Sequence, residues 1–113
     1  MTAPLDEKAK NIGIISYLTL IGWVVALVMH QNHKSSFGAF HIRQMLGVMI
    51  TGVALSLVVQ VIGFVTGSIF LAWSVNILAI IIWLLGFLGA IQGEEREIPI
   101  IGSYFQDWFK SLA

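Results

Sequence analysis

Residues 45–91 read MLGVMITGVALSLVVQVIGFVTGSIFLAWSVNILAIIIWLLGFLGAI and contain no Lys, Arg, Asp or Glu. An α-helix rises 1.5 Å per residue, so roughly 20 apolar residues cross about 30 Å of hydrocarbon. Residues 45–65 and 69–91 each have about this length, and only Thr66, Gly67 and Ser68 separate them. The sequence therefore predicts two transmembrane helices that form a tight antiparallel hairpin.

A third uncharged run, residues 12–29, precedes this hairpin. Its length is also near that of a membrane-spanning helix. Transmembrane strands are disfavoured because they are about half as long and alternate in polarity, and a soluble bundle is disfavoured because its helices need a polar face. The predicted fold is an all-α membrane protein with three transmembrane helices, at about 12–29, 45–65 and 69–91, in a single domain over residues 1–113.

The overall composition limits the classes of function. Of the 113 residues, 58% are hydrophobic and 11% are charged, and six basic residues balance six acidic ones. This composition cannot supply a soluble surface, and a chain without net charge has no basic field to attract nucleic acid. The absence of Cys excludes disulfides and Cys-based metal sites. We expect no cofactor and no nucleic-acid partner.

The basic residues predict an orientation for this three-span topology. Two of them precede the first span, whereas four lie in the connection or after the third span: Lys8 and Lys10 against Lys34, Arg43, Arg96 and Lys110. Cytoplasmic segments of membrane proteins carry an excess of Lys and Arg. We therefore expect a multi-pass protein with its amino terminus outside and its connection and carboxyl-terminal tail in the cytoplasm.

Two amide side chains lie within the predicted hairpin. Gln60 and Asn76 are at similar distances from the turn, so they should lie at similar depth on adjacent helices. A hydrogen bond between them would form a structural clasp, because an unpaired amide in hydrocarbon is costly. The functional alternative is a polar track along a channel or carrier path.

The connection between the first two predicted spans, residues 30–44, reads HQNHKSSFGAFHIRQ and is dense in polar and aromatic side chains. Ser35 or Ser36 can cap a helix that begins before the membrane and continues as the second span. The candidate docking residues on this segment are Phe40, His41, Arg43 and Gln44. Its histidines match no established metal-site spacing, and the sequence predicts no metal site.

The tail has two parts. Glu94, Glu95 and Glu97 form an acidic cluster below the third span, and we expect Arg43 to pair with this cluster. Pro99 is expected to stop the spanning helix. Residues 103–112 then predict an amphipathic helix, with Trp108 on its apolar face, that lies along the membrane, binds a partner or docks on the helix ends. Glu94, Pro99 and Trp108 complete the set of candidate docking residues.

The stretches FHIRQMLG at residues 40–47 and IQGEEREIPIIGSYFQDWF at residues 91–109 resemble the small three-span bacterial membrane proteins known as import component proteins. That group is distantly similar to the twenty-kilodalton subunit of the protein import channel in the chloroplast inner envelope. The resemblance implies the three-span topology, a bacterial inner (cytoplasmic) membrane and participation in a membrane complex. The residues that recur in the group align here with Phe40, His41, Arg43, Gln44, Gly93, Pro99, Ile101 and Gly102.

The leading functional hypothesis is a non-enzymatic membrane subunit that assembles with itself or with other membrane proteins, in protein translocation or in the assembly of a membrane complex. Its expected partners are membrane lipids and further copies or other membrane subunits. The alternative is a small-molecule channel or carrier that uses Gln60 and Asn76. A membrane enzyme based on the histidines is disfavoured, because the sequence shows no carboxylate-rich metal motif and no nucleophile with a placed base.

Overall fold

The computed structural model describes residues 6–113 and, over that range, consists of helices and their connections. Five helices are present in the described part: α1 (Glu7–Ile15), α2 (Leu20–Asn32), α3 (Ser36–Thr66), α4 (Ile69–Ile91) and α5 (Gly102–Trp108). The predicted all-α class is confirmed. The predicted single domain also includes residues 1–5, which lie outside the described residues.

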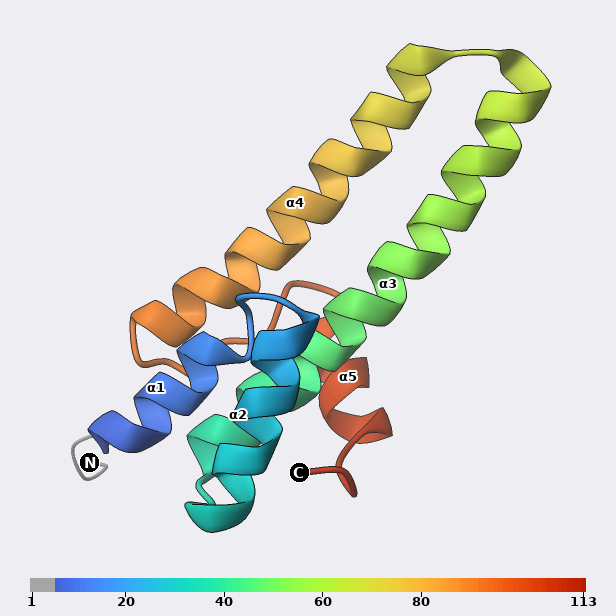
Figure 1. The fold of residues 1–113 in the computed structure, drawn as a ribbon. Coiled ribbons are helices and arrows are strands. Elements are labelled where there is room, and N and C mark those ends of the chain that lie inside the picture. Colours follow the sequence, from blue (N-terminus) through green and yellow to red (C-terminus); the bar gives the residue numbers. More distant parts are fainter. Residues whose placement is uncertain (1–5) are drawn as a thin grey trace.

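The α3–α4 hairpin dominates the molecule (Figure 1). Both helices are long and apolar enough to cross a membrane, and α4 has the predicted bounds. Gly67 ends α3 in the left-handed conformation, with φ of 69°, which glycine adopts at little cost. Ser68 then begins α4, because its side chain accepts a hydrogen bond from the backbone N–H of Leu71. The predicted tight hairpin is therefore confirmed.

Helix α3 begins well before the predicted start of the second span at residue 45. Its N-cap is Ser35, whose side chain accepts a hydrogen bond from the backbone N–H of Gly38 at 3.0 Å. The sequence-based expectation of a serine-capped helix that runs on into the span is confirmed. At 31 residues, α3 is about 46 Å long.

The predicted first span, residues 12–29, is wrong. Helix α1 ends at Ile15, the chain turns, and α2 begins at Leu20, so the structure has two candidate membrane spans and not three. Helix α2 has 13 residues, or about 20 Å, which is too short to cross the hydrocarbon. Side-chain bonds to the backbone favour the break: Ser16 Oγ donates to the carbonyl of Gly13 at 2.6 Å, and Thr19 caps α2.

The pair α1 and α2 forms a helical hairpin that returns to the end of the molecule where it began (Figure 1). A side-chain hydrogen bond joins Asp6, the N-cap of α1, to His33, the C-cap of α2. This bond lowers the pKa of the Asp6 carboxyl group. The prediction that the amino-terminal segment lies opposite the connection is therefore wrong for the described residues.

The core lies at this same end, and we refer to it as the base of the molecule. Helix α3 has buried residues only between Phe37 and Val48, and its remaining turns are half-buried or exposed. Phe64, near the hairpin turn, is 93% exposed. The outer parts of α3 and α4, residues 50–81, thus form two arms whose apolar side chains have little cover within the chain.

Candidate functional site

A polar network inside the base connects the α1–α2 turn to α3. The Tyr17 hydroxyl group lies 2.7 Å from Nδ1 of His41 and accepts a hydrogen bond from Nε2 of Gln44 at 2.8 Å. All three side chains are fully buried. Buried polar groups are costly unless they are hydrogen-bonded, so each member depends on the others.

The same network holds the tail. His41 Nε2 donates to the carbonyl oxygen of Glu94 at 2.8 Å, and Gln44 Oε1 accepts from the backbone N–H of Ile98 at 2.9 Å. Gln44 Nε2 also reaches the carbonyl oxygen of Arg96 at 3.3 Å. Because a carbonyl oxygen can only accept, the proton of a neutral His41 is on Nε2, and Nδ1 accepts from the tyrosine hydroxyl. The donors and acceptors form one consistent, uncharged chain of hydrogen bonds.

Aromatic packing and close helix contact shape this network. The rings of Phe37 and Phe40 lie edge-on to the His41 ring, with centroid distances of 4.5 and 5.0 Å. Gly86 of α4 faces the tyrosine, and a Cβ at that position would lie 2.7 Å from Cε1 of Tyr17. The indole Nε1 of Trp83 donates to the carbonyl oxygen of Tyr17 at 2.7 Å. The turn between α1 and α2 is thus fixed from both spanning helices.

Helix α5 docks on α3. Phe105 is buried against Gly47, where a Cβ would lie 2.1 Å from Cγ of the phenyl ring. Gln106 Nε2 donates to the carbonyl oxygen of Phe40 at 2.8 Å. Trp108, a candidate docking residue, points outward and is exposed. Helix α5 ends at Trp108, so it is shorter than the predicted helix at 103–112.

Arg43 does not form the expected ion pair with the acidic cluster. Its Nη2 donates to the carbonyl oxygens of Lys110 and Ala113, at 3.1 and 2.7 Å. The Glu94 carboxylate instead pairs with Arg96, and Glu95 Oε2 accepts from Ser36 Oγ at 3.0 Å. The connection and the tail are therefore joined, but through backbone carbonyls and a serine.

Pro99 is exposed and lies in a turn, eight residues after α4 ends. The expectation that this proline stops the spanning helix is wrong. Gly93, with φ of 73°, ends the helix, because hydrogen bonds from its N–H to Ala90 and from the N–H of Glu94 to Gly89 close the last turn.

Gln60 and Asn76 do not form the predicted clasp. Both side chains are exposed on the arms, and no hydrogen bond joins them in the described structure. Gln60 lines an open groove of about 660 Å³ along α3, which Leu20 of α2 also borders. The two helices carry the amides at similar depth, as expected, but the amides do not meet.

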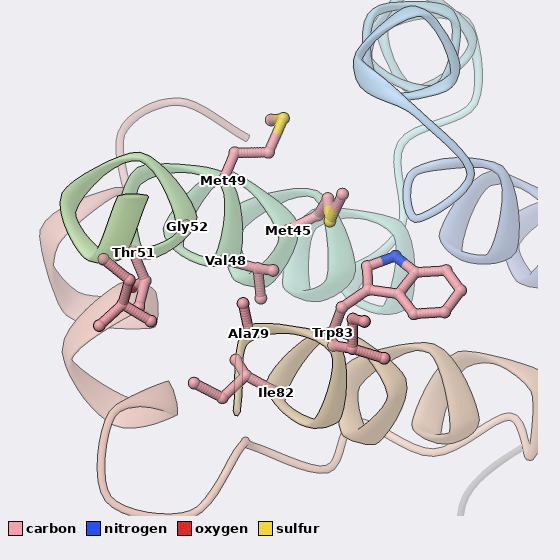
Figure 2. Close-up of a pocket in the computed structure, with 10 residues that line it drawn as sticks. Met45, Val48, Met49, Thr51, Gly52, Ala79, Ile82 and Trp83 are labelled. Carbon is pink, nitrogen blue, oxygen red and sulfur yellow. The ribbon is translucent and has the colours of Figure 1, made fainter. Parts of the chain in front are cut away.

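A second hollow lies between α3 and α4, just beyond the base (Figure 2). Met45 and Met49 border it from α3, and Ala79, Ile82 and Trp83 border it from α4, around a volume of about 260 Å³. Its lining is apolar and contains no titratable group. Within residues 6–113, no three side chains of His, Cys, Asp or Glu gather to hold a metal ion.

Of the candidate docking residues, the structure brings Phe40, His41 and Gln44 into the interior, with the backbone of Glu94 beside them. They hold the chain together and are not available at the surface. Sequence reasoning missed Tyr17, the central member of the network. The available signal was a tyrosine between Ser16 and Thr19 in an otherwise apolar run.

The sequence of this chain is similar to that of an archaeal membrane protein. It is 26% identical, over 119 aligned positions, to a UPF0132 membrane protein of Methanocaldococcus jannaschii, and the match covers 99% of this chain and 76% of the relative. No family model matches the chain. No solved structure matches it either. These comparisons give no link to the import component proteins or to the chloroplast import channel.

The similarity to this membrane protein agrees with the two long apolar helices α3 and α4. Together they show that this chain is a helical membrane protein that is weakly homologous to an archaeal UPF0132 membrane protein.

Proposed function

We propose that this chain is a non-enzymatic membrane subunit whose two arms associate, within the bilayer, with further copies of the chain or with another membrane protein. The observation that carries this proposal is the exposure of Gln60 and Asn76 on the arms. Gln60 is six residues before the end of α3 and Asn76 is seven after the start of α4, so both are about 10 Å from the hairpin turn along the helix axis.

An exposed amide at this depth favours a partner. Water is absent from the hydrocarbon, and an amide group without a hydrogen bond is unfavourable there. A hydrogen bond between amides on neighbouring helices contributes about 0.6 kcal/mol on average, and a chain that carries two such groups can form it more than once. Association of two copies would satisfy amides that a single chain leaves unpaired.

The base would then be a rigid folded part of each subunit, next to the associated arms. Its polar network ties α1, α3 and the tail together, which supports a structural role. All six Lys and Arg residues belong to segments at the base, whereas the hairpin turn has none. By the positive-inside rule, the proposed orientation places the base on the cytoplasmic side of a cytoplasmic membrane. A role in protein translocation rests on the resemblance of residues 40–47 and 91–109 alone.

The test is the oligomeric mass of the protein extracted in native lipid, for the wild-type chain and for a variant with both Gln60→Leu and Asn76→Leu. We expect oligomers for the wild type and a shift toward monomer for the double variant. Ser74→Ala is the matched control, because Ser74 Oγ already donates to the carbonyl of Phe70 in its own helix. A monomeric wild type, or unchanged oligomers in the double variant, would contradict the proposal.

The channel alternative makes a different prediction for the same proteins. A path lined by Gln60 and Asn76 has to form between copies, since both amides are exposed on a single hairpin. Solute flux into vesicles that contain the wild type, lost in the double variant although its oligomers persist, would favour the channel over the structural subunit.

A further inference from the structure

The base is hollowed beside the start of α3, away from the buried network and from the arms. Two neighbouring cavities, of about 450 and 320 Å³, share His30, Lys34 and Ala113. The larger one is also lined by Ser36, Arg43 and Glu95. Neither cavity is part of the proposed association surface.

The nitrogen atoms around the larger cavity are incompletely hydrogen-bonded. His30 is only 3% exposed, and its Nδ1 has no hydrogen-bond partner among residues 6–113. The Nε atom of Arg43 is also buried without a partner in this described part, while Nη2 of the same side chain is held by the tail. Lys34 is exposed and belongs to none of the ion pairs within residues 6–113. Buried polar atoms without partners are uncommon and call for an explanation, such as a bound water or ion.

The electrostatics of the cavity favour an anion. Burial, together with the positive charges of Lys34 and Arg43, lowers the pKa of the His30 imidazole. Two acceptors already lie in the cavity lining: the Glu95 side chain, which is exposed and receives a hydrogen bond from Ser36 Oγ, and an oxygen of Ala113, which accepts from Nη2 of Arg43 at 2.7 Å. An acidic oxygen atom therefore already lies at the amino-terminal end of α3, where free N–H groups and the helix dipole attract negative charge.

We infer that this cavity binds a phosphate group, with charge from Lys34 and Arg43, hydrogen bonds from His30 and Ser36, and Glu95 as an internal competitor that must move aside. The residues combine a cation, a guanidinium group, a hydroxyl group and a helix start, which together suit the several acceptor oxygens of phosphate. The phosphate can belong to the headgroup of an anionic lipid or to a free ion, because both present the same oxygens.

Calorimetric titration of the full chain, in a nonionic detergent and phosphate-free buffer, tests this inference. The two probes are inorganic phosphate and short-chain phosphatidic acid. Lys34→Gln should weaken binding about tenfold, since a charge-assisted hydrogen bond is lost. Glu95→Gln should strengthen it about threefold, since a competing charge is removed. Both side chains are exposed, so the variants should fold.

Lys8→Gln is the matched control, because it removes one exposed positive charge from the base without touching either cavity. It should leave binding unchanged. Equal weakening by Lys8→Gln and Lys34→Gln would show nonspecific attraction and overturn the inference. Binding of phosphatidic acid alone identifies a lipid headgroup as the ligand, and binding of both probes identifies the phosphate group itself. No binding of either probe overturns the inference.

A second test measures the pKa of His30 and does not require a binding constant. In a histidine-labelled sample followed by NMR, a bound anion should raise the pKa of His30, because it stabilises the imidazolium form against the facing charges of Lys34 and Arg43. The resonances of His41, which lies in the closed network, should not respond. A His30 titration curve that is identical with and without either probe contradicts the inference.

Discussion

The Tyr17 hydroxyl group and Nδ1 of His41 lie 2.7 Å apart, and this contact joins the turn between two short helices to the inner end of a spanning helix. Both side chains are fully buried. The contact explains why residues 12–29 do not continue as one helix, since a straight helix would carry the tyrosine away from its partners. The break in the first apolar run is thus linked to the polar network.

Tyr17→Phe should destabilise the protein by about 1–3 kcal/mol, because it leaves Nδ1 of His41 buried without its hydrogen-bond partner. The measurement is the free energy of unfolding in detergent by denaturant titration. Tyr104→Phe is the control, since the Tyr104 side chain is exposed and should tolerate the change. Equal stability of both variants would show that the network contributes nothing measurable.

Gly47→Ala should release α5 from α3, because the new methyl group would overlap the ring of Phe105. We expect faster hydrogen exchange at the backbone amides of residues 102–108. Gly52→Ala places the same methyl group on the same helix, where it meets no atom of another described segment within 4 Å, so it should leave exchange in the tail unchanged. Unaltered exchange in Gly47→Ala would mean that Phe105 does not hold α5.

Single cysteines at three positions test the topology, because the chain has no cysteine of its own. Lys8→Cys and Lys110→Cys should react with a membrane-impermeant maleimide from one side of the membrane, and Ser68→Cys from the other. The reason is that the Asp6–His33 contact brings the start of α1 back to the base. Labelling of positions 8 and 68 from the same side would contradict this topology and support three spans, which put both positions on one side of the membrane.

The stability of the base should fall as the pH drops below about 6.5 in phosphate-free buffer. Burial and the charges of Lys34 and Arg43 lower the pKa of His30 in the folded protein, so the unfolded chain takes up the proton first. The neutral imidazole of His30 contributes stability at pH values above the ordinary pKa of histidine. This contribution is lost as the pH falls toward the lowered pKa of His30 in the folded protein. Denaturant midpoints between pH 8 and pH 5 measure this loss, and His30→Gln should reduce the slope. An unchanged slope would assign the loss to another group.

Ile100→Gly should stabilise the protein by about 1 kcal/mol. Ile100 has φ of 75°, a conformation that is strained for a β-branched residue, and its side chain is 88% exposed. Removing the side chain therefore relieves strain and loses little packing. Ile100→Ala keeps the Cβ atom and should give less stabilisation, and a thermal unfolding series compares the two. A glycine variant that is no more stable than the alanine variant would refute the strain argument.

The spanning hairpin could be predicted because its signals are local. The lack of charge over residues 45–91 determines that the helices are apolar, and Gly67 and Ser68 mark where one ends and the next begins. The start of α3 was also predictable, since a serine cap needs only its own first turn. These features depend on neighbours in sequence.

The first apolar run could not be assigned in this way. Hydropathy reports that residues 12–29 avoid water, but it does not distinguish a span from two packed helices. The difference depends on Tyr17 meeting His41 and Gln44, which lie 24 and 27 residues further along the chain. No local pattern contains that information.

Two of the candidate docking residues, His41 and Gln44, lie on one buried face of α3. The sequence predicted them as part of a docking surface. The tail covers that face, because the backbone of residues 94–98 supplies their hydrogen-bond partners. A sequence shows that a face is polar, but the fold determines what lies against it.

The uncharged turn at residues 66–68 has a consequence for biogenesis. In the proposed orientation, the only polar connection that must be carried through the lipid consists of Thr66, Gly67 and Ser68, and none of the ionisable side chains of residues 6–113 has to make that passage. Transfer of a charged group through the bilayer centre is among the most unfavourable steps in membrane insertion. The hairpin can therefore enter the bilayer as one unit while the charged residues of the base stay on the side where they began, without a dedicated step that pulls either end of the described chain across.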